Sequence, residues 1–141
     1  MPYRYALIDT TTGEHLFRAP HVCRLAGITY RQLDYWARTG LVEPSGQAAA
    51  GSGTQRLYTC GDLAVLRLIA AGLDAGITLR TAREIVAVAR DRDAALGPGD
   101  VIVVDRAGPR IIPPGDLDLS GPAVLIPVDP YLPECCHPVA A

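Results

Sequence analysis

The segment HVCRLAGITYRQLDYWARTGLVEPSGQAAAGSGTQRLY, residues 21–58, decides the fold of this 141-residue chain. Its pattern predicts a helix, a tight turn, a second helix and a flexible basic loop, in that order. The first helix places Val22, Leu25 and Ala26 on one face, and Gly27 then ends the run. This order of elements suits binding in a groove of DNA.

The second helix has a start signal and a stop signal. Thr29, with Gln32 three residues later, forms a capping-box pattern, and Gly40 suits the left-handed conformation that ends a helix. The residues expected to face inward are Leu33, Trp36 and Ala37. Trp36 is therefore expected to fill the core under this helix rather than to stack on DNA.

The outward side of the second helix is predicted to contact DNA. It carries donors, acceptors and flat rings that suit phosphates and base edges, from Thr29, Tyr30, Arg31, Tyr35 and Arg38. Two interpretations stay open for Tyr35. Either its hydroxyl bonds a phosphate, or its ring is partly buried in the protein. Arg24 on the first helix is either a contact to the DNA backbone across the groove or a solvated arginine.

The segment carries several motifs that occur together in one protein family. They are Tyr35-Trp36 in the second helix, Gly40-Leu41 and Pro44 after it, and Arg56-Leu57-Tyr58 at the end of the loop. With these motifs the segment resembles the winged helix-turn-helix domain of MerR-type transcription regulators. The resemblance implies that the second helix reads the major groove and that a wing ending at Arg56 clamps the flanking backbone.

Two more helices extend this resemblance to roughly residues 17–92. Thr59 with Asp62 opens one helix, and the turn at residues 76–78 leads into the other. The inward residues are expected to be Leu63, Leu66, Ile69, Ala70 and Leu73, and then Leu79, Ala82, Ile85, Val86 and Ala89. Arginines interpreted as solvated helix faces are Arg67, Arg80, Arg83, Arg90 and Arg92.

The loop GQAAAGSG, residues 46–53, lies where the hairpin turn of a wing would be. Its side chains are too small to hold a fixed shape by themselves. Gln55 and Arg56 at its end would lie beside the DNA backbone or a minor groove, giving register more than base specificity. The alternative interpretation of this loop is a plain linker.

Two departures from the family bear on mechanism. Asp34 stands where many members carry an arginine that meets the DNA backbone. Because an aspartate repels phosphate, we expect Asp34 to pair with Arg31 or Arg38. Beyond Arg92 the chain also lacks the apolar heptads of the long dimer helix that typical members have.

The C-terminal third predicts a small β unit. Apolar runs at residues 101–104, 110–112 and 123–128 predict three strands, with a turn at residues 105–108. A unit of roughly forty residues is hard to stabilise alone. We therefore expect it to pack on the fourth helix, on an N-terminal strand at residues 3–8, or on a second subunit. Its order of elements is similar to the C-terminal domain of the FtsR-type regulators, an actinobacterial branch of the MerR family.

The predicted fold class is mainly α with small β, a winged helix-turn-helix followed by two helices and a small C-terminal β unit. The expected divisions are an N-terminal extension or strand at residues 1–16, the DNA-binding domain at 17–92, and a dimerisation or effector unit with a frayed tail at 93–141. Residues 1–92 hold 11 arginines against 8 acidic residues, a balance of +3, whereas residues 93–141 hold 2 against 7, a balance of −5. The basic part can therefore grip DNA although the whole chain has a formal net charge of −2.

Cys135-Cys136-His137 resembles the Cys-Cys-His found near the C-terminus of some metal-sensing MerR relatives. Thiolates and imidazole are ligands for zinc or copper(I). The other cysteines of such sensors have no counterpart between Cys60 and Cys135. A frayed tail with free thiols is therefore the favoured interpretation, and a metal or thiol sensor is the alternative. Cys23 and Cys60 are expected to be small packing residues.

Enzyme signatures such as a glycine-rich phosphate loop or a nucleophile with its base and acid are missing from the sequence. We predict no metal site and no cofactor, and we expect His21 to begin the first helix. The apolar runs are too short to span a bilayer and no leader pattern is seen, so the expected location is the cytoplasm.

We predict a regulator that binds double-stranded DNA as a homodimer. As its resemblance implies, it would bind a pseudo-palindromic promoter site and distort the DNA to change how RNA polymerase engages it. One alternative is an architectural or excisionase-like protein that bends DNA or polymerises along it without an effector. The other is the metal or thiol sensor that uses the terminal Cys-Cys-His.

Overall fold

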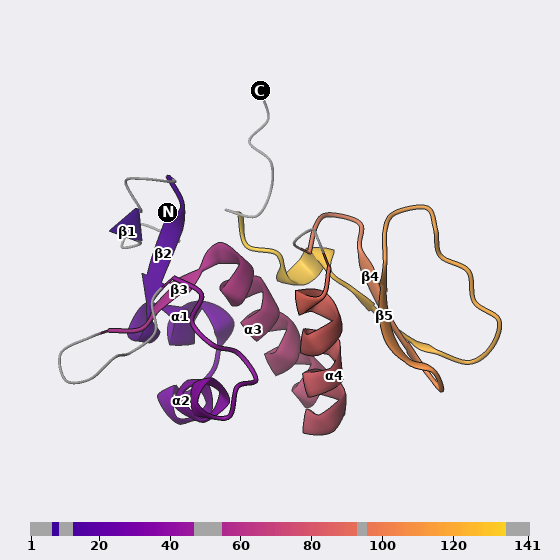
Figure 1. Cartoon of the computed structure of the whole chain (residues 1–141), viewed down its shortest axis with the longest axis horizontal. Helices are drawn as coiled ribbons and strands as arrows, with labels where there is room; N and C mark the ends of the chain where they lie inside the picture. The colour runs from indigo at the N-terminus through magenta and orange to yellow at the C-terminus, as the bar shows by residue number, and fades with distance from the viewer. Residues whose placement is uncertain (1–6, 9–12, 47–54, 93–95, 135–141) are drawn as a thin grey trace.

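The computed structural model describes residues 7–8, 13–46, 55–92 and 96–134. In this part of the chain, four helices lie between two small antiparallel sheets (Figure 1). The elements are β1 Leu7–Ile8, β2 His15–Arg18, α1 Ala19–Ala26, α2 Tyr30–Arg38, β3 Leu57–Thr59, α3 Cys60–Asp74, α4 Leu79–Arg90, β4 Val101–Asp105, β5 Gly108–Ile112, β6 Val124–Pro127 and the short 3-10 helix η1 Asp129–Tyr131. The expected class, mainly α with small β, is confirmed.

The helix-turn-helix forms from the signals seen in the sequence. Gly27 ends α1 with φ of 69°, a left-handed conformation that suits glycine. The capping box of α2 is present, because the Thr29 hydroxyl accepts from the Gln32 N–H at 3.1 Å and the Gln32 side chain accepts from the Thr29 N–H at 2.9 Å. Trp36 is 4% exposed and lies in the core, as expected.

The first helix begins earlier than expected. It starts at Ala19, so His21 is not its first residue but lies inside its first turn and is buried. The His21 ring meets the Phe17 ring edge to face, with centroids 5.5 Å apart. The expectation that His21 begins the helix is wrong because residues 19 and 20 already adopt helical conformation, with Pro20 tolerated in the first turn.

The N-terminal sheet has the order β1-β2-β3, with both pairs antiparallel. Phe17 on β2 lies opposite Tyr58 on β3, and both side chains are completely buried. Strand β2 was not anticipated from the sequence, and of the strand expected at residues 3–8 only Leu7–Ile8 lies within the described residues. The base of the expected wing is closed by the Gly46 N–H, which donates to the Leu57 carbonyl at 2.9 Å.

The C-terminal sheet has the order β5-β4-β6 and lies beside α4, on the side of the helices away from α1 and α2 (Figure 1). A second hydrophobic core of the protein lies here and is built from Ala64, Leu68, Ile85, Ile102, Val128 and Leu132. These residues come from α3, α4, β4 and the segment around η1. Three packing partners of the C-terminal unit were possible from the sequence. Among the described residues the unit packs on the fourth helix, α4, and also on α3.

Four of the five arginines interpreted as solvated are instead engaged within the protein. Three donate to carbonyls near the ends of α1 and α2: Arg67 Nε to Leu25 O at 3.0 Å, Arg83 Nη1 to Thr39 O at 3.2 Å, and Arg90 Nη2 to Leu41 O at 3.2 Å. Helix C-termini leave carbonyls without intrahelical partners and carry partial negative charge, which favours arginine. Arg92 pairs with the buried Asp100 at 2.9 Å. Arg80 fits the interpretation, with 90% of its side chain exposed, and Arg90 remains exposed although it is bonded.

The two cysteines within helical patterns contribute to packing. Cys60 is buried in the N-terminal core and is also disulfide-bonded, so it is more than the small packing residue expected, whereas Cys23 is a free cysteine that packs against that core. Burial raises the pKa of the Cys23 thiol above its ordinary value.

Candidate nucleic-acid interface

Helix α2 presents two large aromatic rings to solvent. Tyr30 is 60% exposed and Tyr35 is 45% exposed, although the same short helix buries Leu33 and Trp36 completely or nearly so. Arg31 and Arg38 are exposed on the same side. Rings and guanidinium groups displayed together are the side chains that contact nucleic acid through stacking, hydrogen bonding and charge.

The remaining residues expected to bind DNA are all at the surface except one. Thr29 is exposed, although its hydroxyl oxygen serves as the cap of α2. Arg24 lies exposed in the last turn of α1, and Gln55 is exposed where the chain enters β3. The side chains of Arg24 and Arg31 make no hydrogen bond or ion pair with another described residue. Arg56 is the exception, since only 19% of its side chain is exposed.

Arg56 is held by Asp34 on α2. Arg56 Nη1 donates to Asp34 Oδ1 at 2.8 Å, while Arg38 Nε donates to Asp34 Oδ2 at 2.8 Å. The Arg56 and Arg38 guanidinium groups hold the pKa of Asp34 below its ordinary value, and Asp34 in turn raises the pKa of Arg56. The expected pairing of Asp34 with Arg38 is confirmed, whereas the alternative partner, Arg31, is not bonded to it.

The link to Arg56 could not be read from the sequence. Asp34 was recognised as unusual for its position, but Arg38 is four residues away on the same helix, whereas Arg56 is 22 residues away on another element. Helical spacing identifies the first partner and says nothing about the second. The expected position of Arg56 beside a phosphate requires this ion pair to be exchanged for one with DNA.

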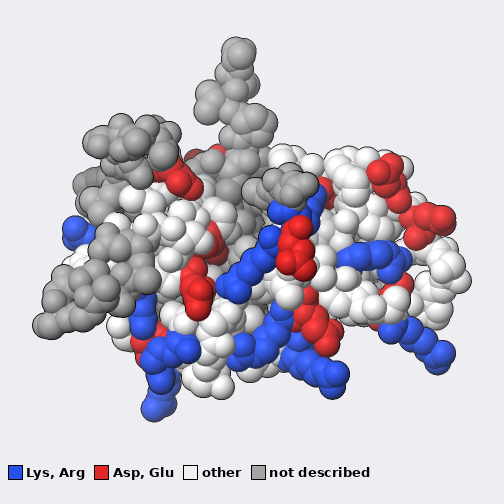
Figure 2. Space-filling view, viewed as in Figure 1, with Lys and Arg blue, Asp and Glu red and all other residues white. Residues whose placement is uncertain are grey.

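Arginine side chains gather along one edge of the molecule, over α2 and the lower end of α4 (Figure 2). The described arginines of these two helices are Arg31, Arg38, Arg80, Arg83 and Arg90. Since Arg83 and Arg90 anchor the end of α2 to α4, this edge is also internally tied together. A positive edge of this kind is the electrostatic footprint expected of a surface that meets phosphate.

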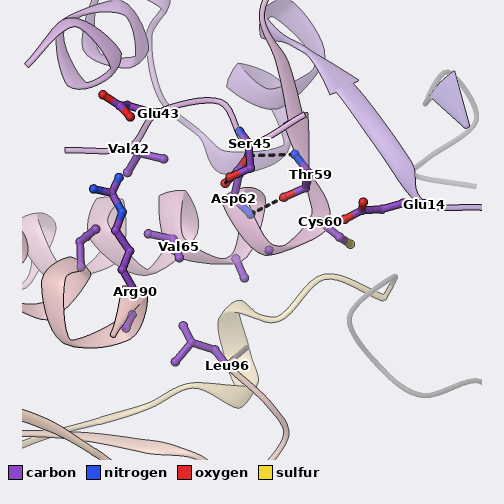
Figure 3. A pocket seen from close by; sticks show the side chains of 14 residues that line it. Glu14, Val42, Glu43, Ser45, Thr59, Cys60, Asp62, Val65, Arg90 and Leu96 are labelled. Atoms are coloured by element: carbon purple, nitrogen blue, oxygen red, sulfur yellow. Dashed lines mark hydrogen bonds between the residues drawn. The ribbon is translucent and has the colours of Figure 1, made fainter. Parts of the chain in front are cut away.

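A cavity of about 490 Å³ lies behind the interface, between the base of the wing, α3 and α4 (Figure 3). Val42, Val65 and Leu96 supply apolar lining, and Asp62 and Arg90 contribute charged side chains. Asp62 is engaged by Ser45 and Thr59, and Arg90 by the Leu41 carbonyl. These two charged groups therefore serve the fold.

Within the described ranges, His, Cys, Asp and Glu side chains do not come together in threes as a metal site would need. The proposed ligands Cys135, Cys136 and His137 lie outside the described residues. Among the helices the structure describes, none has the length and apolar character to cross a membrane.

The sequence matches a family model described as MerR HTH family regulatory protein over residues 17–88. It is 55% identical over 76 residues to uncharacterized HTH-type transcriptional regulators of Mycobacterium tuberculosis and Mycobacterium bovis, a match that covers 54% of this chain and 34% of each relative. The matched part thus spans about a third of the length of these relatives. A crystal structure of a MerR-family transcriptional regulator from Bacillus cereus aligns with a TM-score of 0.45 at 28% identity, over 56% of this chain and 55% of that one.

Proposed function

The chain belongs to the MerR HTH family of regulatory proteins, and we propose that it is a sequence-specific DNA-binding transcriptional regulator. The observation that carries the proposal is the exposed face of α2, where Tyr30 and Tyr35 stand in solvent beside Arg31. Two exposed tyrosine rings on a nine-residue helix leave apolar surface in water, whereas a helix with a purely structural role would gain stability by burying them. A partner that stacks on the rings and accepts hydrogen bonds accounts for this arrangement.

In this proposal α2 lies in the major groove. The N-terminal residues of a recognition helix come closest to base edges, which assigns that role to Thr29, Tyr30 and Arg31. Tyr35 and Arg38, further along the helix, would contact phosphates. Arg24 would reach the backbone from α1, and Gln55 with Arg56 would meet it from the wing. These contacts would fix the position of the protein on DNA rather than read its sequence.

We further propose that the protein acts as a dimer joined through its C-terminal sheet. Strand β6 lies at the edge of that sheet and exposes Val124 by 55% and Leu125 by 42%. The preceding loop exposes Leu117 and Leu119 by more than 40% each. An apolar edge strand is a template for pairing with another strand, and a second copy would cover it in a symmetric contact.

A two-fold dimer would bind a pseudo-palindromic promoter site, and its relatives' names as transcriptional regulators support an effect on transcription. The proposal is tested by selecting binding sites from a pool of random duplexes with the purified chain. Enrichment of a motif with two inverted half-sites is expected. Recovery of no motif, with retention of all sequences alike, would favour an architectural DNA-binding protein instead.

The dimer is tested separately by sedimentation of the full chain. Leu125→Glu should convert the dimer to a monomer, because it buries a charge at the proposed contact. The matched control is Ala87→Glu, a glutamate added at an exposed position of α4. A Leu125→Glu protein that stays dimeric would remove the C-terminal sheet from the proposal without touching the role of α2.

A further inference from the structure

We propose that Asp34 is a specificity-determining residue of the DNA interface, because its carboxylate occupies Arg38 and Arg56 and so lowers affinity for DNA of arbitrary sequence. This inference rests on the proposed DNA-binding function and deepens it. It assigns a role to the one acidic side chain on α2, the helix that carries Tyr30, Arg31 and Arg38.

The position of Asp34 places it within the exposed face. It lies four residues after Tyr30 and four before Arg38, a spacing that aligns the three along one side of a helix. Its side chain is 28% exposed, so the carboxylate is open to the medium from which DNA would approach. A negative charge at this point repels phosphate.

The two ion pairs use both oxygens of the carboxylate. Oδ1 accepts from Arg56 and Oδ2 from Arg38, each at 2.8 Å. A carboxylate and a phosphate offer arginine the same kind of acceptor, so Asp34 competes with DNA for both guanidinium groups. The competition is stronger for Arg56, whose side chain is 19% exposed, than for Arg38, whose side chain is 63% exposed.

Arbitrary and cognate DNA are affected differently. Binding to arbitrary sequence comes almost entirely from phosphate contacts and counterion release, so withholding two arginines removes a large share of it. A cognate site adds base contacts from α2, which also demand that the wing and helix hold a fixed register. Before DNA binds, the pair of Asp34 and Arg56 ties the base of the wing to α2 and so presets that register, which only a cognate site needs. Arg56 leaves the pair for a phosphate once the base contacts form.

The test compares Asp34→Asn with the unmodified full chain on a selected cognate duplex and on a scrambled duplex, by fluorescence anisotropy over a range of salt concentrations. The substitution keeps the shape and removes the charge. Scrambled-duplex affinity is expected to rise about tenfold near 0.1 M salt, and its salt slope to steepen by about 1 to 2, as one or two phosphate contacts are gained. The cognate affinity should rise less, so the specificity ratio falls.

Asp105→Asn is the matched control. Asp105 is a carboxylate that likewise accepts from an arginine, Arg110, but it lies on β4 in the C-terminal sheet. It changes the net charge equally and should leave both affinities and both slopes unchanged. Adding Arg56→Gln to Asp34→Asn should cancel part of the gain, because the freed arginine is then missing.

The outcomes separate this inference from the proposed function. If a folded Asp34→Asn protein binds the scrambled duplex with unchanged affinity and an unchanged salt slope, the role of Asp34 is overturned while α2 remains the reading helix. Equal losses on both duplexes with an unchanged slope would show that Asp34 has only a structural role. A chain with no preference for the cognate duplex would count against the proposed function, and a chain that binds no DNA would overturn both.

Discussion

Asp62 binds Ser45 twice, accepting from its backbone N–H at 2.8 Å through Oδ2 and from its hydroxyl at 2.6 Å through Oδ1. The same carboxylate accepts from the Thr59 N–H at 2.9 Å, completing the capping box of α3 (Figure 3). One buried side chain therefore joins the start of the wing, its end and the helix that follows. The wing is therefore held at its base by α3.

Asp62→Ala should lower the free energy of unfolding by about 1 to 3 kcal/mol, because it removes the acceptor of three part-buried hydrogen bonds from Ser45 and Thr59 and removes a helix cap. Urea denaturation measures the effect. The matched control is Asp74→Ala at the other end of α3, where the side chain is exposed, and its effect should stay within about 0.5 kcal/mol. Equal losses in both proteins would contradict the linking role of Asp62.

Gly46→Ala should open the base of the wing. A Cβ at this position would lie 2.8 Å from the Leu57 carbonyl oxygen and 2.8 Å from Leu16 Cδ2, and backbone at that distance cannot yield without moving β3. We expect destabilisation of about 1 to 3 kcal/mol, as for other overpacked sites, and weaker DNA binding.

Gly61→Ala is the control for this change. Gly61 lies in the first turn of α3, and its Cβ would meet only the Thr59 hydroxyl oxygen at 3.8 Å. Alanine should therefore stabilise the helix by up to about 1 kcal/mol. Thermal melting of the two proteins gives the comparison, and a Gly46→Ala protein as stable as the parent would show that the wing base is free to shift.

Local signals predicted the helix-turn-helix correctly because its start and stop residues act within a few positions of themselves. Thr29 with Gln32 and Thr59 with Asp62 both form the capping boxes that their spacing predicts. The strand at residues 15–18 was missed because four residues carry little periodicity and its pairing with β3 joins positions about forty residues apart.

The arginines at the interface also depend on contacts between distant parts of the sequence, which local patterns do not predict. Arg83 and Arg90 occupy surface positions of an amphipathic helix, which by pattern alone predicts solvation. Their acceptors are carbonyls at the end of α2, 44 and 49 residues away, and only the folded packing of α4 against that end brings them within reach. Asp34 was singled out correctly as anomalous, but its second partner depended on the same kind of distant contact.

Arg31→Ala should weaken binding to the selected cognate duplex by about 1 to 3 kcal/mol while the fold is retained, because the substitution removes the contact to a base edge proposed for Arg31. Arg31 makes no ion pair with another described residue, so its loss should not disturb packing. Arg106→Ala, at an exposed arginine in the turn between β4 and β5, is the control and should change cognate affinity little. Comparable losses from both substitutions would indicate a general charge effect rather than reading by α2.

The Tyr58 hydroxyl should ionise at a higher pH than is ordinary for a tyrosine. Its side chain is completely buried, and its hydroxyl has no hydrogen-bond partner among the described residues. Burial is the main cause that raises the pKa of Tyr58 from the ordinary value of 10.0 to about 12. Titration followed by the ultraviolet absorbance of tyrosinate should therefore show a step near pH 12, and Tyr58→Phe should remove that step.

The same shift predicts how stability depends on alkaline pH. Because the folded pKa lies above the unfolded one, the neutral hydroxyl is favoured in the folded state, and the contribution of Tyr58 is fully present below about pH 10 and falls between about pH 10 and 12. The Tyr58→Phe protein should lack this part of the decline, and below pH 10 it should be at least as stable as the parent, since the substitution removes a buried polar group without a described partner. The difference between the two urea-denaturation curves across this range isolates Tyr58 from the other groups that titrate there. If both proteins lose stability in parallel, Tyr58 ionises near its ordinary pKa and is in contact with water in the folded state.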